Sequence, residues 1–151
     1  MEQHKIAIIT GGSRGIGAAT TKLFAEHGYA VCINYKSKSA PAEQLANYIR
    51  EQGGKCITVQ ADVANEEDVE RLFTTVDQQL GAISVLINNA GILKPQMRLQ
   101  YMTAARINEV LINNVTSYFL CSREAVKRMS TKQGGNGGTI VNVSSGAAKS
   151  G

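Results

Sequence analysis

Five short apolar runs punctuate this chain of 151 residues, and segments with helical spacing lie between them. Each run is almost continuously apolar, which is typical of strands buried on both faces of a parallel sheet. Parallel strands need crossover connections, and these are right-handed. The pattern therefore predicts an α/β fold, a doubly wound parallel sheet with helices on both faces. The runs are residues 6–9, 30–33, 56–59, 85–87 and 140–143.

Capping residues and apolar spacing mark the helices expected between the runs. The first helix begins in a glycine-rich turn, and its expected apolar face carries Ile16, Ala19, Leu23, Phe24 and His27. Gly28 is expected to close it, as a glycine just beyond a helix does. The remaining expectations are a helix that Asn65 caps, a polar loop over residues 34–39, and a long helix over residues 103–129.

The charge balance argues against a nucleic-acid partner. The net charge is +4, but Lys and Arg are scattered, and no basic run is interleaved with aromatic residues. We expect the positive excess to attract anionic ligands such as a phosphorylated cofactor. The alternative is an ordinary solvated basic surface.

The cysteines indicate the compartment. There are three of them, an odd number without close spacing, and Cys32 and Cys56 lie in apolar runs where a buried thiol is expected. This usage predicts a reducing, cytoplasmic setting. No apolar stretch is long enough to cross a membrane, so no membrane partner is expected, and we predict no metal site.

Residues 10–17 form the glycine-rich turn between the first run and the first helix. Gly11, Gly15 and Gly17 let the backbone turn sharply and let a phosphate approach without meeting a Cβ atom. Free N–H groups at the start of the helix then point at that phosphate. The turn therefore predicts a dinucleotide pyrophosphate site, with a plain strand–helix turn as the alternative. Ser13, Arg14 and Ile16 complete it, and Ile16 is expected to act through its backbone N–H.

The other candidate residues also follow strands. In a doubly wound sheet, ligands bind beyond the carboxyl ends of the strands. Every candidate falls at such an end, so all of them are expected to meet at one edge of the sheet. They are Tyr35 and Lys36, Asp62, residues 88–91, and Ser145.

Two cations bear on the choice of cofactor. An NAD site places an acid after the second strand to accept hydrogen bonds from the ribose 2′-hydroxyl. Residues 34–38 contain no acid, whereas Arg14 and Lys36 can bind a phosphate. The sequence therefore favours NADP(H), with NAD(H) possible. The alternative is that both residues are ordinary surface cations.

Together these motifs resemble the short-chain dehydrogenase/reductase family, most closely its glucose-dehydrogenase-like and general oxidoreductase members. Residues 10–17 match the family pattern Thr-Gly-x-x-x-Gly-x-Gly, and residues 88–91 match Asn-Asn-Ala-Gly. The resemblance covers the whole chain. It implies a Rossmann-type fold and hydride transfer between a nicotinamide and an alcohol or carbonyl compound. Asp62 and Val63, Asn114, and Ser145 match further family positions.

The resemblance also implies roles. Ser145 would hydrogen-bond the substrate carbonyl. Asn114 would hold a water molecule in a proton relay. The alternatives for Asn114 are that its side-chain amide makes a structural hydrogen bond, or that Asn113 holds the water instead. Asp62 would accept a hydrogen bond from adenine, with helix capping as the alternative, while Val63 would add a backbone contact. Asn89, Ala90 and Gly91 would line the ribose, or simply form a tight turn. Family members are homotetramers or homodimers.

One family motif is absent from these residues. The family carries Tyr-x-x-x-Lys about a dozen residues after the serine, but the sequence ends at Gly151, and none of its five tyrosines has a lysine four positions later. We expect residues 1–151 to be an NAD(P)-binding Rossmann domain that forms the N-terminal part of a longer single-domain enzyme. Residues 1–151 alone are expected to be inactive. The alternative is a non-catalytic dinucleotide-binding module.

Overall fold

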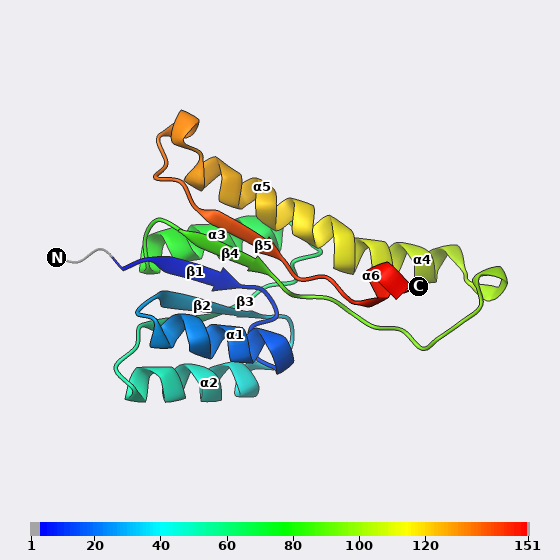
Figure 1. The fold of residues 1–151 in the computed structure, drawn as a ribbon, viewed down its shortest axis with the longest axis horizontal. Helices are drawn as coiled ribbons and strands as arrows, with labels where there is room; N and C mark the ends of the chain where they lie inside the picture. The colour runs from blue at the N-terminus through cyan, green and yellow to red at the C-terminus, as the bar shows by residue number, and fades with distance from the viewer. Residues whose placement is uncertain (1–3, 151) are drawn as a thin grey trace.

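The computed structural model describes residues 4–150, in which five parallel strands form one sheet (Figure 1). The order is β3-β2-β1-β4-β5, so the direction of winding reverses between β1 and β4. This doubly wound, Rossmann-type sheet confirms the predicted fold class. This reversal is a topological switch point, where such folds bind ligands. The strands are β1 (Ile6–Ile9), β2 (Ala30–Tyr35), β3 (Cys56–Gln60), β4 (Val85–Asn88) and β5 (Thr139–Asn142).

Helices cover both faces of the sheet, and β1 shows why. Ile6 and Ile8 pack on one face with α3 and α5, whereas Ala7 and Ile9 pack on the other with α2. Side chains alternate along a strand, so a continuously apolar strand supplies both cores. The helices are α1 (Gly15–Glu26), α2 (Ser39–Glu51), α3 (Glu66–Gln79), α4 (Ala104–Leu111), α5 (Ser117–Met129) and α6 (Ala147–Ser150), with short 3₁₀ turns at Leu99–Tyr101 and Thr131–Gln133.

The predicted long helix is interrupted by a π-helical turn. Thr103 caps α4 by accepting a hydrogen bond from the Arg106 N–H, as expected from the sequence. The π turn η2 (Ile112–Thr116) joins α4 to α5 and contains Asn114. Such turns concentrate at functional sites. The apolar spacing of residues 103–129 does not predict this one.

The predicted apolar face of α1 is wrong in part: Phe24 packs against the core, but Ile16 and Leu23 do not. Ile16 and Leu23 are 65% and 55% exposed, while Gly17 and Thr21 are buried. The Thr21 hydroxyl donates a hydrogen bond to the Gly12 carbonyl at 3.2 Å. The small residues on this side of α1 therefore let the helix approach the glycine turn closely. The helix therefore packs through small residues near its start, and through Phe24 near its end.

Several element boundaries also differ from the sequence prediction. β2 continues through Asn34 and Tyr35, and α2 already begins at Ser39, so the loop expected over 34–39 shortens to 36–38. The polar residues remain in the strand because Asn34 is buried and fully hydrogen-bonded. β5 is shifted by one residue, to 139–142.

The predicted burial of Cys32 and Cys56 is confirmed, and Cys121, for which no burial was predicted, is buried as well. Cys32, Cys56 and Cys121 are buried and carry free thiols. Burial raises the pKa of the Cys56 thiol to about 11, so this group is protonated at neutral pH. Within residues 4–150, none of the helices is both long and apolar enough to span a membrane.

Candidate functional site

The amino end of α1 projects from the carboxyl end of β1. Arg14 is its N-cap in extended conformation, and neither a side-chain cap nor an acidic first-turn residue satisfies its N–H groups. Gly15 has φ +54°, a left-handed conformation that suits glycine, and a Cβ there would meet no atom within 4 Å. An uncapped helix start that faces open space is suited to an anion.

Gly17 lies against the turn itself. A Cβ at this position would come within 2.2 Å of the Gly11 carbonyl and 2.6 Å of Asn89 Nδ2. Only a residue without a side chain lets the first turn of α1 lie this close to the loop. Gly17 therefore fixes where the free N–H groups point.

Asn34 anchors the turn to the neighbouring strands, a role that sequence reasoning missed. Its side-chain oxygen accepts the Gly11 N–H at 3.2 Å, and its carbonyl accepts the Gly12 N–H at 2.9 Å. Its amide nitrogen donates to the carbonyls of Val59 and Ala61. The only signal for it in the sequence is a polar residue directly after a buried apolar run.

Asn34→Leu should lower the free energy of unfolding by about 2–3 kcal/mol, because it leaves a buried N–H and two carbonyls without their partner. Dinucleotide affinity should fall as well, since the turn loses its tie to β3. Urea unfolding and nucleotide titration measure the two effects. Asn47→Leu, on the exposed side of α2, is the control and should change neither; an equal loss in both variants would contradict the anchoring role.

Thr10 and Asn89 tie the loops after β1 and β4 together. The buried Thr10 hydroxyl accepts the N–H groups of Asn89 and Ala90, at 2.9 and 3.0 Å. Asn89 Nδ2 donates to the carbonyls of Thr10 and Gly11. The side chain of Asn89 therefore positions the glycine turn, which favours the structural alternative for this residue.

A cavity of about 380 Å³ opens beside this turn. It lies between the carboxyl ends of β1, β2, β3 and β4, as the sheet topology predicts. Gly15, Ile16 and Gly17 continue from its rim as the first turn of α1. The predicted residues that line the cavity are Gly11, Ser13, Arg14, Tyr35, Lys36, Asp62, Val63, Asn89, Ala90 and Gly91.

The charges in this cavity are not all free. Lys36 Nζ lies 3.2 Å from Asp62 Oδ2, across the space between β2 and β3. The other Asp62 oxygen accepts the Ala64 N–H at 3.0 Å, whereas Asn65 caps α3. The alternative of Asp62 as the helix cap is therefore wrong. Among residues 4–150, the Arg14 side chain makes no hydrogen bond or ion pair.

Asn114 and Ser145 are not among the residues that line this cavity, although Asn114 contacts Ile92, which does. The Asn114 amide pairs with Ile92, accepting its N–H at 2.7 Å and donating to its carbonyl at 2.9 Å. This structural pairing is the alternative foreseen for Asn114. Ser145 is exposed beyond β5, and its hydroxyl oxygen accepts the Ala147 N–H. Asn114 also borders an apolar cavity of about 340 Å³ beside α4.

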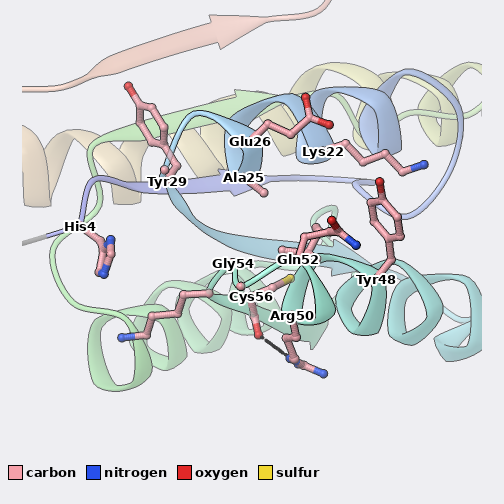
Figure 2. Close-up of a pocket in the computed structure, with 14 residues that line it drawn as sticks. His4, Lys22, Ala25, Glu26, Tyr29, Tyr48, Arg50, Gln52, Gly54 and Cys56 are labelled. Atoms are coloured by element: carbon pink, nitrogen blue, oxygen red, sulfur yellow. Dashed lines mark hydrogen bonds between the residues drawn. The ribbon is translucent and has the colours of Figure 1, made fainter.

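A larger cavity, of about 650 Å³, lies at the opposite edge of the sheet (Figure 2). It is lined by the carboxyl-terminal parts of α1 and α2, whose dipoles disfavour phosphate. Two of its cations are engaged: Lys22 Nζ lies 5.1 Å from the centre of the Tyr48 ring, and Arg50 donates to the Cys56 carbonyl. Despite its volume, this cavity does not suit a dinucleotide.

Potential metal ligands are dispersed over the described part of the chain. No group of three or more His, Cys, Asp or Glu side chains within residues 4–150 is placed to hold a metal ion. The residues that line the 380 Å³ cavity supply backbone N–H groups, amides, hydroxyls, one carboxylate and cations.

Comparisons with known proteins agree with this geometry. The family model for short chain dehydrogenases matches residues 5–151. The uncharacterized oxidoreductase YgfF of Escherichia coli K12 is 52% identical over 146 residues, which are 97% of this chain and 59% of YgfF. A 3-oxoacyl-[acyl-carrier-protein] reductase of Synechocystis is 38% identical over 141 residues, 93% of this chain and 56% of the reductase.

A solved structure shows the same fold. The short-chain dehydrogenase/reductase from Serratia marcescens BCRC 10948 superposes with a TM-score of 0.89 at 32% identity, covering 97% of this chain and 57% of that protein. The chain thus spans less than 60% of the length of each of these three proteins. From its glycine turn, its strand order and the family match over residues 5–151, this chain belongs to the short-chain dehydrogenase family.

Proposed function

We propose that the protein is an NADP(H)-dependent oxidoreductase that acts on a small alcohol or carbonyl compound. The observation that carries this proposal is the uncapped start of α1, where Gly15 faces open space and Gly17 allows close approach. These residues fit a dinucleotide pyrophosphate, which their N–H groups would hold. When bound, the nicotinamide supplies or accepts the hydride.

The cavity residues would hold the rest of the cofactor. Arg14 has no partner among residues 4–150 and can form a fork to the 2′-phosphate, with Lys36 beside it. Ala90 and Gly91 leave room for the ribose. Asp62 and Val63 border the space expected for adenine.

Ser145 would stabilise charge on the substrate oxygen by donating its hydroxyl hydrogen bond. Its exposed position beyond β5 is compatible with this role. The side chain of Asn114 is occupied by Ile92, so this residue would act by shaping the π turn η2 and through its backbone. A tyrosine–lysine pair, which the family resemblance implies, would exchange the proton. We therefore propose turnover for a protein of the relatives' length.

A dinucleotide-binding module without turnover is the second candidate. The observation that favours it is that residues 1–151 contain no Tyr-x-x-x-Lys motif, because none of the five tyrosines has a lysine four positions later. Turnover by residues 1–151 alone would contradict both this module and our placement of the proton-exchanging pair.

We also propose a homodimer or homotetramer in a reducing, cytoplasmic compartment. Ile107, Leu111, Val115 and Phe119 recur every four residues along α4, η2 and α5, and Phe119 is 74% exposed. Exposed apolar rows of this kind are typical of protein interfaces. The free cysteines support the compartment. A monomer in sedimentation experiments would contradict the oligomer.

Arg14→Ala should weaken NADP(H) binding about tenfold to a hundredfold, because a phosphate loses charge-assisted hydrogen bonds. NAD(H) lacks that phosphate, so its affinity should change little. Calorimetric titration of both cofactors measures the difference. Arg98→Ala removes the same charge outside the cavity and should affect neither. An equal loss of both cofactors in Arg14→Ala would contradict the assignment.

A further inference from the structure

We propose that Asp62 is a specificity-determining residue that limits the preference for NADP(H) over NAD(H), because it competes with the 2′-phosphate for Lys36. This inference rests on the proposed function. It arises from the ion pair between Lys36 Nζ and Asp62 Oδ2, at 3.2 Å, inside the candidate cofactor cavity.

Asp62 is a fixed anion. Its N–H donates to Asp68 Oδ2 at 2.7 Å, and its Oδ1 accepts the Ala64 N–H at 3.0 Å. Asp68 is itself held, because its N–H donates to the capping side chain of Asn65. The second oxygen of Asp62, Oδ2, is paired with Lys36 Nζ.

Lys36 is anchored at its backbone and free to move at its tip. Gln60 Nε2 donates to the Lys36 carbonyl at 2.6 Å, which fixes the start of the side chain at the edge of β3. The side chain is 60% exposed, so its four-carbon stem can swing. The ammonium group can therefore pair with Asp62 or with a phosphate in the same cavity.

The two cofactors make opposite demands on this pair. A 2′-phosphate can form an ion pair with Lys36 only if Lys36 leaves Asp62, and the phosphate is also repelled by the nearby Asp62 carboxylate. A ribose that ends in a 2′-hydroxyl needs neither cation and can donate a hydrogen bond to a carboxylate. Asp62 thus lowers the advantage that Arg14 and Lys36 give to NADP(H).

This geometry revises the argument from the sequence. Residues 34–38 contain no acid, which by itself favours NADP(H). The sheet order places the end of β3 beside the end of β2, and Asp62 reaches Lys36 from there. Asp62, which follows β3, thus places a carboxylate beside the loop after β2, which has none of its own.

The test is the ratio of two affinities in each variant. Titration calorimetry with NADP⁺ and NAD⁺, and with the fragments 2′,5′-ADP and 5′-AMP, gives the ratio without any need for turnover. Asp62→Asn keeps an oxygen for the Ala64 N–H but removes the charge, so the preference for the 2′-phosphate ligands should rise on the order of fivefold. Lys36→Met should lower it by a similar factor. Glu67→Gln, an exposed charge change outside the cavity, should leave it unchanged.

The outcomes separate the inference from the proposed function. A loss of folded protein in Asp62→Asn acts equally on both ligands and cancels in the ratio. An unchanged or lowered ratio in Asp62→Asn, or an unchanged ratio in Lys36→Met, overturns the competition while NADP⁺ and NAD⁺ still bind. Failure of the wild-type protein to bind any of the four ligands overturns the proposed function itself.

Discussion

Gly17→Ala should weaken dinucleotide binding about a hundredfold and lower the free energy of unfolding by about 1–3 kcal/mol. The added Cβ would meet the Gly11 carbonyl at 2.2 Å and Asn89 Nδ2 at 2.6 Å, so the turn and the helix must move apart. That movement displaces the free N–H groups of the first turn of α1. Losing two hydrogen bonds to a charged phosphate is enough for an effect of this size.

A matched control separates the clash from simple weakening of the helix. Ala19→Gly, on the exposed side of α1, costs about 1 kcal/mol of helix stability without touching the turn. It should change the midpoint of thermal unfolding but leave affinity nearly intact. Calorimetric titration and thermal unfolding of both variants provide the comparison. If the two variants lose affinity equally, the close approach at Gly17 is not what holds the ligand.

Glu124→Gln should lower the free energy of unfolding by about 2–3 kcal/mol. The Glu124 side chain is only 6% exposed, and its two oxygens lie 2.7 Å from Lys127 Nζ and 3.2 Å from Arg128 Nη1. Arg128 also pairs with Asp77 at 2.8 Å, which ties α5 to α3. Removing one partner of a buried pair is costly, but the partly exposed cations reduce the loss.

The effect of Glu124→Gln should depend on pH. Burial raises the pKa of Glu124, but hydrogen bonds from Lys127 and Arg128 outweigh it and hold this pKa below its ordinary value of 4.5. The ionised carboxylate therefore stabilises the fold fully above pH 4.5, and this contribution disappears as the pH falls through the lower folded pKa. Urea unfolding should show a difference from wild type that is largest at neutral pH.

Glu70→Gln is the matched control for this network. Glu70 is 53% exposed and lies 3.6 Å from Arg123, so its ion pair should contribute little. Its unfolding curve should follow that of the wild type at every pH. Glu124→Gln and wild type should differ in their free energy of unfolding. If this difference stays constant on acidification, the ionised Glu124 carboxylate is not the stabilising group.

Much of the fold was predictable because local signals and tertiary demands agree. Continuous apolar runs gave all five strands, and Asn65 and Gly28 were correctly expected at helix ends. The apolar face of α1 was predicted only in part: Phe24 packs against the core, but the close approach at Gly17 selects small residues such as Thr21 in place of Ile16. Periodicity detects large apolar residues and cannot detect a helix that packs through small ones.

For the candidate site, the sequence predicts which residues follow the ends of strands, but not which contacts they make with one another. The residues that line the cavity follow different strands, and topology alone brings them together. The anchoring role of Asn34 and the ion pair of Lys36 with Asp62 depend on distances across neighbouring strands. One chain read in order cannot give such distances. The π turn at Asn114 is likewise a product of packing.

The most direct test of the central claim is an amide NMR titration with NADP⁺. We claim that a dinucleotide binds through the N–H groups at the start of α1. We expect the largest chemical-shift changes at the amides of Gly15, Ile16 and Gly17, with a change at Lys36 as well. Unchanged signals for these amides, or changes that gather at Lys22 and other residues around the larger cavity of Figure 2, would contradict this binding site.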